Sequence, residues 1–172
     1  MLIGAILALC GAVMQGLFRN PLAEPGIIGV SAGSALGAAL AIVLFSKISV
    51  QYPAFMNFAA VPVFAFLGGA LTTLLVYKLG TGKFGTSVTI MLLAGVAISA
   101  LSGAGIGFLN FIADDQMLRD LSLWSMGSLA GAKWSGILLA AVTLVGLFII
   151  FYRQAMSPVS YTHLRAHETY VH

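Results

Sequence analysis

The chain has 172 residues, of which 60% are hydrophobic and 8% are charged, and its mean hydropathy is +1.03. This balance excludes a water-soluble globular domain, because most of its surface would be apolar. The formal net charge of +3 does not indicate nucleic-acid binding, since the few Lys and Arg residues are spread among polar segments instead of clustered on one face. We therefore expect a protein that is embedded in a lipid bilayer.

Five continuous apolar runs without a charged side chain follow one another along the chain. Each is close to the ~20 residues that a helix needs to cross the hydrocarbon core. A membrane-spanning barrel would instead show alternating segments of about ten residues, and within a continuous run only a helix satisfies its own backbone. The sequence predicts an all-α, polytopic membrane helical bundle of about five transmembrane helices, at residues 1–18, 26–45, 58–77, 88–111 and 134–152.

The first run ends where a proline follows a cation. Pro21 cannot continue a helical hydrogen-bond ladder, and Arg19 stands where a helix C-terminus and lipid headgroups both favour positive charge. Pro25 and Gly26 then turn the chain into the second run. Cys10 is the single cysteine, so no disulfide within the chain is possible.

Small residues recur every four positions in the second and fourth runs. This spacing places them on one side of each helix, where they let helix backbones approach closely in lipid. We predict helix packing at these positions, with lining of a substrate path as the alternative. They are Gly29, Gly33 and Gly37 in the second run, and Gly95, Ser99, Gly103 and Gly107 in the fourth.

The segment between the fourth and fifth runs is too polar to cross a membrane and too long for a tight turn. Its apolar residues share one face, so we expect a short helix that lies at the outer membrane interface, with Trp124 and Trp134 as headgroup anchors.

The sequence changes character after Met156. Residues 157–172 resemble translated adapter sequence, so we predict a partial transmembrane domain at 1–156 and a non-native tail at 157–172. The tail holds all three histidines, but His163, His167 and Glu168 do not have the order of a zinc motif, and we expect no metal site.

The chain lacks the motifs of a self-powered transporter or an enzyme. Gly80 to Lys83 resemble a phosphate-binding loop, but Tyr77 stands at the position of the required first glycine, and Phe84 follows the lysine where a Ser or Thr is needed. The apolar runs hold no ionisable group to couple transport to a cation gradient, and no nucleophile lies beside a base. We expect no enzyme activity and no cofactor, with energy coming from a partner.

The charged residues between the runs give a weak indication of topology. The set that we expect on the cytoplasmic side exceeds the other by one Lys or Arg residue. It contains Arg19, Lys78, Lys83 and Arg153, with Glu24, and the other set contains Lys47, Arg119 and Lys133, with Asp114, Asp115 and Asp120.

Three stretches of the sequence, at 11–33, 92–99 and 124–131, resemble the FecCD family of ABC importer permeases. The first stretch is the most characteristic. Its matching residues are Gln15, Arg19, Asn20, Pro21, Leu22, Ala23, Pro25, Gly26, Gly29 and Gly33.

The resemblance implies a subunit of ten membrane helices, of which this chain would hold the second to the sixth. It also implies a permease homodimer in the bacterial inner membrane, with ABC ATPase subunits inside and a substrate-binding protein outside. The first helix, the segment that couples to the ATPase and the last four helices would be missing.

The resemblance further suggests a cytoplasmic gate. Its candidate residues are Asn20 and Leu22, joined by Thr86 and Ser87 or, in another register, by Val88 and Thr89. Helix capping by the hydroxyl and amide side chains is an equally sound interpretation.

The function that we expect is import of ferric siderophores by a permease of which this chain is a fragment. Cobalamin or haem import within the same family remains open, as does a structural or regulatory membrane module without transport. A secondary transporter would need an ionisable residue in a span or inverted repeats, and the sequence shows neither.

Overall fold

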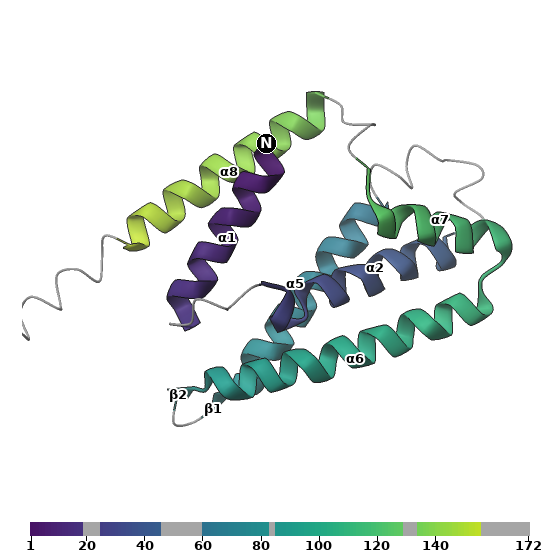
Figure 1. Ribbon diagram of the computed structural model, residues 1–172, viewed down its shortest axis with the longest axis horizontal. Helices are drawn as coiled ribbons and strands as arrows, with labels where there is room; N and C mark the ends of the chain where they lie inside the picture. Colours follow the sequence, from purple (N-terminus) through teal and green to yellow (C-terminus); the bar gives the residue numbers. More distant parts are fainter. Residues whose placement is uncertain (19–24, 46–59, 83–84, 129–133, 156–172) are drawn as a thin grey trace, which may run out of the picture. The chain divides into compact units, whose positions relative to one another are not determined.

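The computed structural model describes residues 1–18, 25–45, 60–82, 85–128 and 134–155, and the description that follows concerns these residues (Figure 1). They are almost entirely helical, which confirms the predicted all-α bundle. The α-helices are α1 (Leu2–Phe18), α2 (Val30–Leu44), α5 (Val61–Gly80), α6 (Val88–Ile112), α7 (Asp115–Met126) and α8 (Trp134–Ala155). A 3-10 helix, η1 (Pro25–Ile28), precedes α2, and two short strands, β1 (Thr81–Gly82) and β2 (Gly85–Thr86), join α5 to α6.

The chain divides into two units. One consists of Phe18–Ser128, and the other of Met1–Leu17 together with Leu129–His172. Each unit is described by itself.

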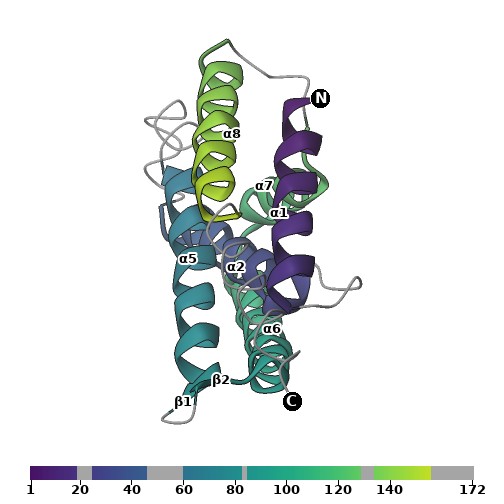
Figure 2. The same cartoon turned by 90° about the vertical axis from the view of Figure 1, so that its left-hand side faces the viewer.

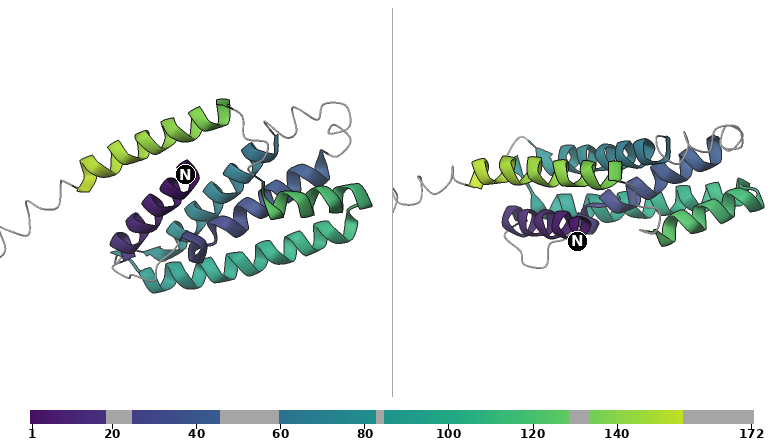
Figure 3. Two further views of the ribbon diagram at one scale, coloured as in Figure 1. Left: turned by 45° about the horizontal axis from the view of Figure 1, so that its top comes forward. Right: turned by 90° about the horizontal axis from the view of Figure 1, so that it is seen from above.

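Helix α2 is the centre of the unit Phe18–Ser128. It lies between α5 and α6, which diverge from the end where β1 and β2 connect them (Figures 1 and 3). Its side chains are small, so neighbouring backbones come close on several sides. Its buried residues are Gly33, Gly37, Ala38, Ala39, Ala41, Ile42 and Val43.

Two apolar clusters fill the space beside the C-terminal half of α2. One joins Ala38, Ala41 and Ile42 to Ala60 and Val61 at the start of α5. The other joins Ala39 and Val43 to Leu109 of α6. Helix α7 closes this end, since Leu121 packs against both clusters.

Helix α7 forms within the segment for which the sequence predicted a short helix. Asp114 caps its N-terminus, where the backbone N–H of Met117 donates to Oδ1 of Asp114 at 2.8 Å. The helix stops at Gly127, whose φ of 68° other residues adopt only with strain.

The outer surfaces of α5 and α6 carry large apolar side chains. Phe66 on α5 and Leu93, Leu101 and Phe111 on α6 are all well exposed. Both helices are long and apolar enough to cross a membrane, as is the part of α8 from Gly136 to Arg153. Helices α1 and α2 are apolar but shorter, with 17 and 15 residues. The surface composition is therefore that of helices whose outer faces contact lipid.

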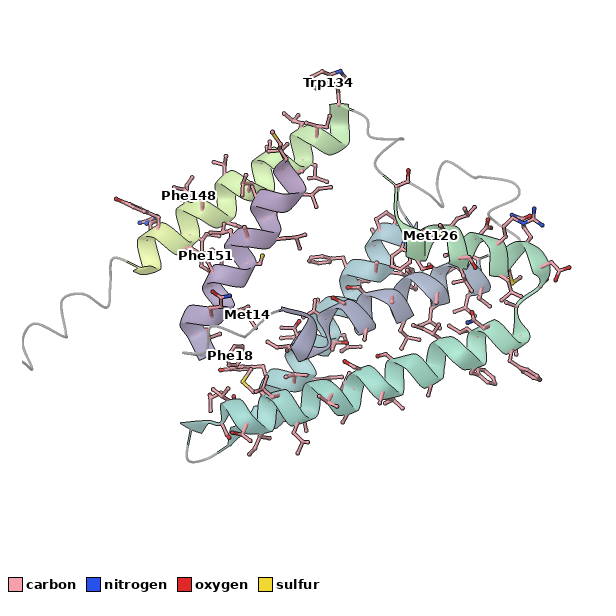
Figure 4. The ribbon with its side chains drawn as sticks, viewed as in Figure 1. Met14, Phe18, Met126, Trp134, Phe148 and Phe151 are labelled. Atoms are coloured by element: carbon pink, nitrogen blue, oxygen red, sulfur yellow. The ribbon has the colours of Figure 1, made fainter. Side chains whose placement is uncertain are left out.

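Helix α8 carries large side chains along its length, and none of its residues from Gly136 to Arg153 is buried. Figure 4 shows Trp134 at its beginning and Phe148 projecting from its side. The ring of Phe148 stacks on Tyr152 one turn later, with centroids 6.1 Å apart.

Candidate functional site

A sharp elbow joins η1 to α2. The N–H of Gly29 donates to the carbonyl of Gly26 at 3.0 Å, and the N–H of Gly33 donates to the carbonyl of Gly29 at 2.9 Å. Between these bonds Gly29 has φ 79° and ψ 8°, the left-handed conformation. A residue with a Cβ enters this region at a cost of roughly 1–2 kcal/mol, so the elbow explains why a glycine stands here.

Three helices meet around Gly29. A Cβ at this position would lie 3.0 Å from Oγ of Ser99 and 3.1 Å from the carbonyl oxygen of Gly95, both on α6. It would also lie 3.4 Å from the Cγ2 methyl of Thr72 on α5. The position is therefore closed to side chains by space as well as by backbone conformation.

The glycines that follow on α2 face α5. A Cβ at Gly33 would overlap the Thr72 side chain, and one at Gly37 would overlap the carbonyl group of Phe64. On α5, Gly68 lies against the backbone of Gly33, and Gly69 against Ser34. Gly68 and Gly69 were not predicted as packing residues from the sequence, although an adjacent glycine pair within an apolar helix was a usable signal.

The small residues of α6 divide into two pairs. Gly95 and Ser99 contact the elbow, whereas no described atom beyond the nearby backbone of α6 itself lies within 4 Å of a Cβ built at Gly103 or Gly107. An α-helix turns about 100° per residue, so each step of four residues moves about 40° around its axis. The buried side of α6 continues instead through Ser102 and Leu109. The packing role of Gly103 and Gly107 stays a prediction.

The candidate gate residues are only partly within the described chain. Asn20 and Leu22 lie outside the described residues, as do the motif residues Arg19, Pro21 and Ala23. Of the other motif residues, Gln15 is exposed on α1, and Pro25 and Gly26 begin η1.

The remaining gate candidates are consecutive at the start of α6. Thr86 ends β2, Ser87 is the N-cap, and Val88 and Thr89 occupy the first turn. Figure 2 shows this end, where β1 and β2 connect α5 to α6. The backbone N–H of Ile90 donates to Oγ of Ser87 at 3.4 Å. Ser87 therefore caps α6, which is the alternative to a gate role that the sequence left open. Thr86, Val88 and Thr89 are exposed.

The buried polar side chains of the described residues are neutral. They are Thr72 and Ser102, and no group of three or more His, Cys, Asp or Glu in the described part of the chain could hold a metal ion.

These features define a class of protein. Apolar helices that pack through glycine and serine, and that expose large apolar side chains outward, belong to multi-pass membrane proteins. Within that class, the chain belongs to the FecCD transport family, whose model matches residues 1–163. The match passes the boundary at 156 where the sequence predicted the tail to begin. That boundary lies outside the described residues and stays a prediction.

Relatives in this family carry different cargoes. The chain is 42% identical to the hemin transport system permease protein HmuU of Yersinia pestis, over 89% of this chain and 44% of the relative. It is 38% identical to the iron(3+)-hydroxamate import system permease protein FhuB of Bacillus subtilis, over 88% of this chain and 37% of the relative. A cobalamin import permease of Halobacterium salinarum is also 38% identical, over 78% of this chain and 34% of the relative. The chain thus spans less than half the length of these relatives.

One solved structure agrees with the fold. It is described as an inward-facing conformation of a proposed metal-chelate type ABC transporter, and it superposes with a TM-score of 0.67 at 34% identity. The match covers 84% of this chain and 43% of that one.

Proposed function

We propose that this chain is part of the permease subunit of an ATP-driven, binding-protein-dependent importer, and that its cargo is a ferric siderophore. The observation that carries the proposal is the elbow at Gly29, where family-motif residues bring α2, α5 and α6 into close contact. The relatives at this level of identity are permease proteins of import systems. The complete subunit works as a homodimer, with ABC ATPase subunits that hydrolyse ATP and an external binding protein that delivers the cargo.

The absence of a buried charged side chain among the described residues suits a bulky chelate. A large cargo can pass along a neutral surface that binds it weakly, whereas a small ion would need fixed ligands. The subunit lies in the bacterial inner membrane, with the connection between α5 and α6 on the cytoplasmic side. Lys78 in the last turn of α5 supports this orientation, because basic residues are enriched near cytoplasmic ends.

Haem is the second candidate cargo, and it is supported by the hemin permease, which shares 42% identity with this chain. Cobalamin is a third, supported by the archaeal relative. A membrane module without transport is the alternative from another class.

The test uses the complete reading frame from the same DNA, expressed with its neighbouring ATPase and binding-protein genes. Cells that lack their own importers receive a labelled ferric hydroxamate, haem or cyanocobalamin. ATP-dependent uptake of the ferric hydroxamate supports the proposal, and uptake of haem or cyanocobalamin alone moves the cargo to the second or third candidate. Uptake of none, from a folded and membrane-inserted complex, favours the module without transport.

The candidate gate can be tested in the same cells. Val88→Trp places a bulky ring at the start of α6, and Leu93→Trp is the matched control on the outward side of the same helix, where Leu93 is 70% exposed. We expect strongly reduced uptake for Val88→Trp at unchanged protein level, and near-normal uptake for Leu93→Trp. Equal uptake by the two variants would show that the start of α6 does not form the gate.

A further inference from the structure

We infer that residues 80–82 and 85–91 form a clamp that holds α5 and α6 together at one end, so that the two helices move as one body during transport. The inference rests on the proposed function, because it concerns how the permease changes shape. Its evidence is the contact set between the end of α5, the two short strands and the first turn of α6.

The backbone ties the two helices through the strands. Thr81 pairs with Thr86 and Gly82 with Gly85 in antiparallel register. Directly beyond this pair, the N–H of Ser87 donates to the carbonyl of Gly80 at 2.8 Å. This bond gives a partner to one of the carbonyls that the end of α5 would otherwise leave unsatisfied.

Side chains add to the backbone bonds. The hydroxyl oxygens Oγ1 of Thr81 and Thr86 lie 3.2 Å apart, within hydrogen-bond distance. Gly80 is buried directly beneath Met91, so that a Cβ at Gly80 would overlap the Met91 side chain. Met91 itself is only 7% exposed.

Ser87 belongs to both helices at once. Its N–H bonds the end of α5, its carbonyl accepts from the N–H of Met91 at 3.1 Å, and its Oγ caps α6. A change in the angle between α5 and α6 at this end would therefore break bonds on both sides of one residue.

The opposite ends of α5 and α6 lack this direct connection. There the two helices diverge, and the C-terminal half of α2 stands between Val61 on one side and Leu109 on the other (Figure 1). Helix α2 packs there through apolar contacts. Sliding along such contacts costs less free energy than breaking hydrogen bonds. We therefore expect α5 and α6 to tilt together when the permease changes shape. The segment from Thr86 to Thr89 would move with them.

The test is a reversible cross-link in the complete importer. Thr81→Cys and Thr86→Cys are combined with Cys10→Ser, which removes the competing thiol. Because the two threonine oxygens already lie 3.2 Å apart, sulfurs in their place need only a small shift to reach the ~2.05 Å of a disulfide. Disulfide yield is measured in the nucleotide-free and ATP-trapped states, and uptake is measured before and after reduction.

We expect equal disulfide yield in both states. A disulfide that forms in one state only or in neither overturns the clamp. If the wild type and the reduced variant both fail to import any cargo, the proposed function fails instead.

A second measurement decides the clamp without uptake. Spin labels at Leu79→Cys and Leu93→Cys, two sites that are 60% and 70% exposed, report the distance between α5 and α6 without disturbing the clamp. A distance between the two labels of one subunit that nucleotide leaves unchanged supports the inference, and a distance that changes with nucleotide overturns it.

Discussion

Helices α2 and α8 are both strongly apolar, yet they differ in how many of their residues are buried within their own units. Of the 15 residues of α2, seven are buried, whereas α8 has no buried residue between Gly136 and Arg153. The difference follows side-chain size: glycine, alanine and serine line α2, while α8 carries leucine, isoleucine and phenylalanine. Lipid solvates large apolar side chains as well as a protein interior does, so close packing, and not hydrophobicity, selects the helices that pair.

The largest effect is expected from breaking the close contact of α2. Gly33→Val would drive a branched side chain into Thr72 and the Gly68 carbonyl, and we expect a loss of about 3 kcal/mol in unfolding free energy, at the upper end for overpacked cores. Denaturation in mild detergent, followed by circular dichroism, measures the loss. Gly146→Val on α8 is the control, because no described atom lies within 4 Å of its added Cβ. Similar losses at the two positions would contradict the role that we give to side-chain size.

The next effect concerns the elbow at the start of α2. Gly29→Ala combines a left-handed backbone with contacts of 3.0 and 3.1 Å to Ser99 and Gly95, and we expect a loss of about 2 kcal/mol. Adding Ser99→Gly relieves the contact with Oγ but not the backbone strain, so the double variant should regain part of the stability in the same assay. A double variant no more stable than Gly29→Ala would show that the backbone alone makes Gly29 necessary.

A smaller effect is expected where α7 closes the C-terminal end of α2. Asp114→Ala removes the Oδ1 atom that accepts a hydrogen bond from the Met117 N–H. The loss of such an N-cap costs about 1 kcal/mol. Asp115→Ala, one residue later in the first turn, removes a charge but no capping bond and should cost less. Thermal unfolding of the two variants measures the difference, and an equal cost would assign the effect to charge.

The smallest effect is expected on α8. Leu139 is 69% exposed, so Leu139→Ala should change the unfolding free energy by less than about 0.5 kcal/mol. Ile42→Ala on α2 is the counterpart, because Ile42 is 8% exposed in an apolar cluster, and it should cost about 2 kcal/mol or more. A large loss for Leu139→Ala would mean that α8 packs on protein in the assayed state.

Continuous apolar runs predicted the helices well, since composition alone decides whether a segment can lie in lipid. The fourth run was predicted at 88–111 and the helix is Val88–Ile112. The third was predicted at 58–77, but the helix continues to Gly80, because Lys78 can extend its charge toward water from the end of an apolar helix. The second run was predicted as one helix and is instead interrupted at Gly29, whose left-handed φ no hydropathy pattern records.

The contacts of the candidate site were less accessible to sequence reasoning. The stripe of Gly29, Gly33 and Gly37 was visible, but its partners on α5 depend on how two helices cross. The strands at Thr81 and Thr86 have two residues each, too short for an alternating pattern. Family resemblance supplied Asn20 and Leu22, and their place stays a prediction because they lie outside the described residues.

The short connection between α5 and α6 also bears on how the chain enters the bilayer. Residues 81–87 are all that separate two long apolar helices, so the two helices form a hairpin whose distant ends, near Val61 and Ile112, lie on the same face of the membrane. In the proposed orientation the bend itself stays on the cytoplasmic face and is never translocated. Polar groups at the bend pair with each other through Thr81, Thr86 and Ser87, so the bend can remain at the headgroups while the ribosome is still synthesising α8.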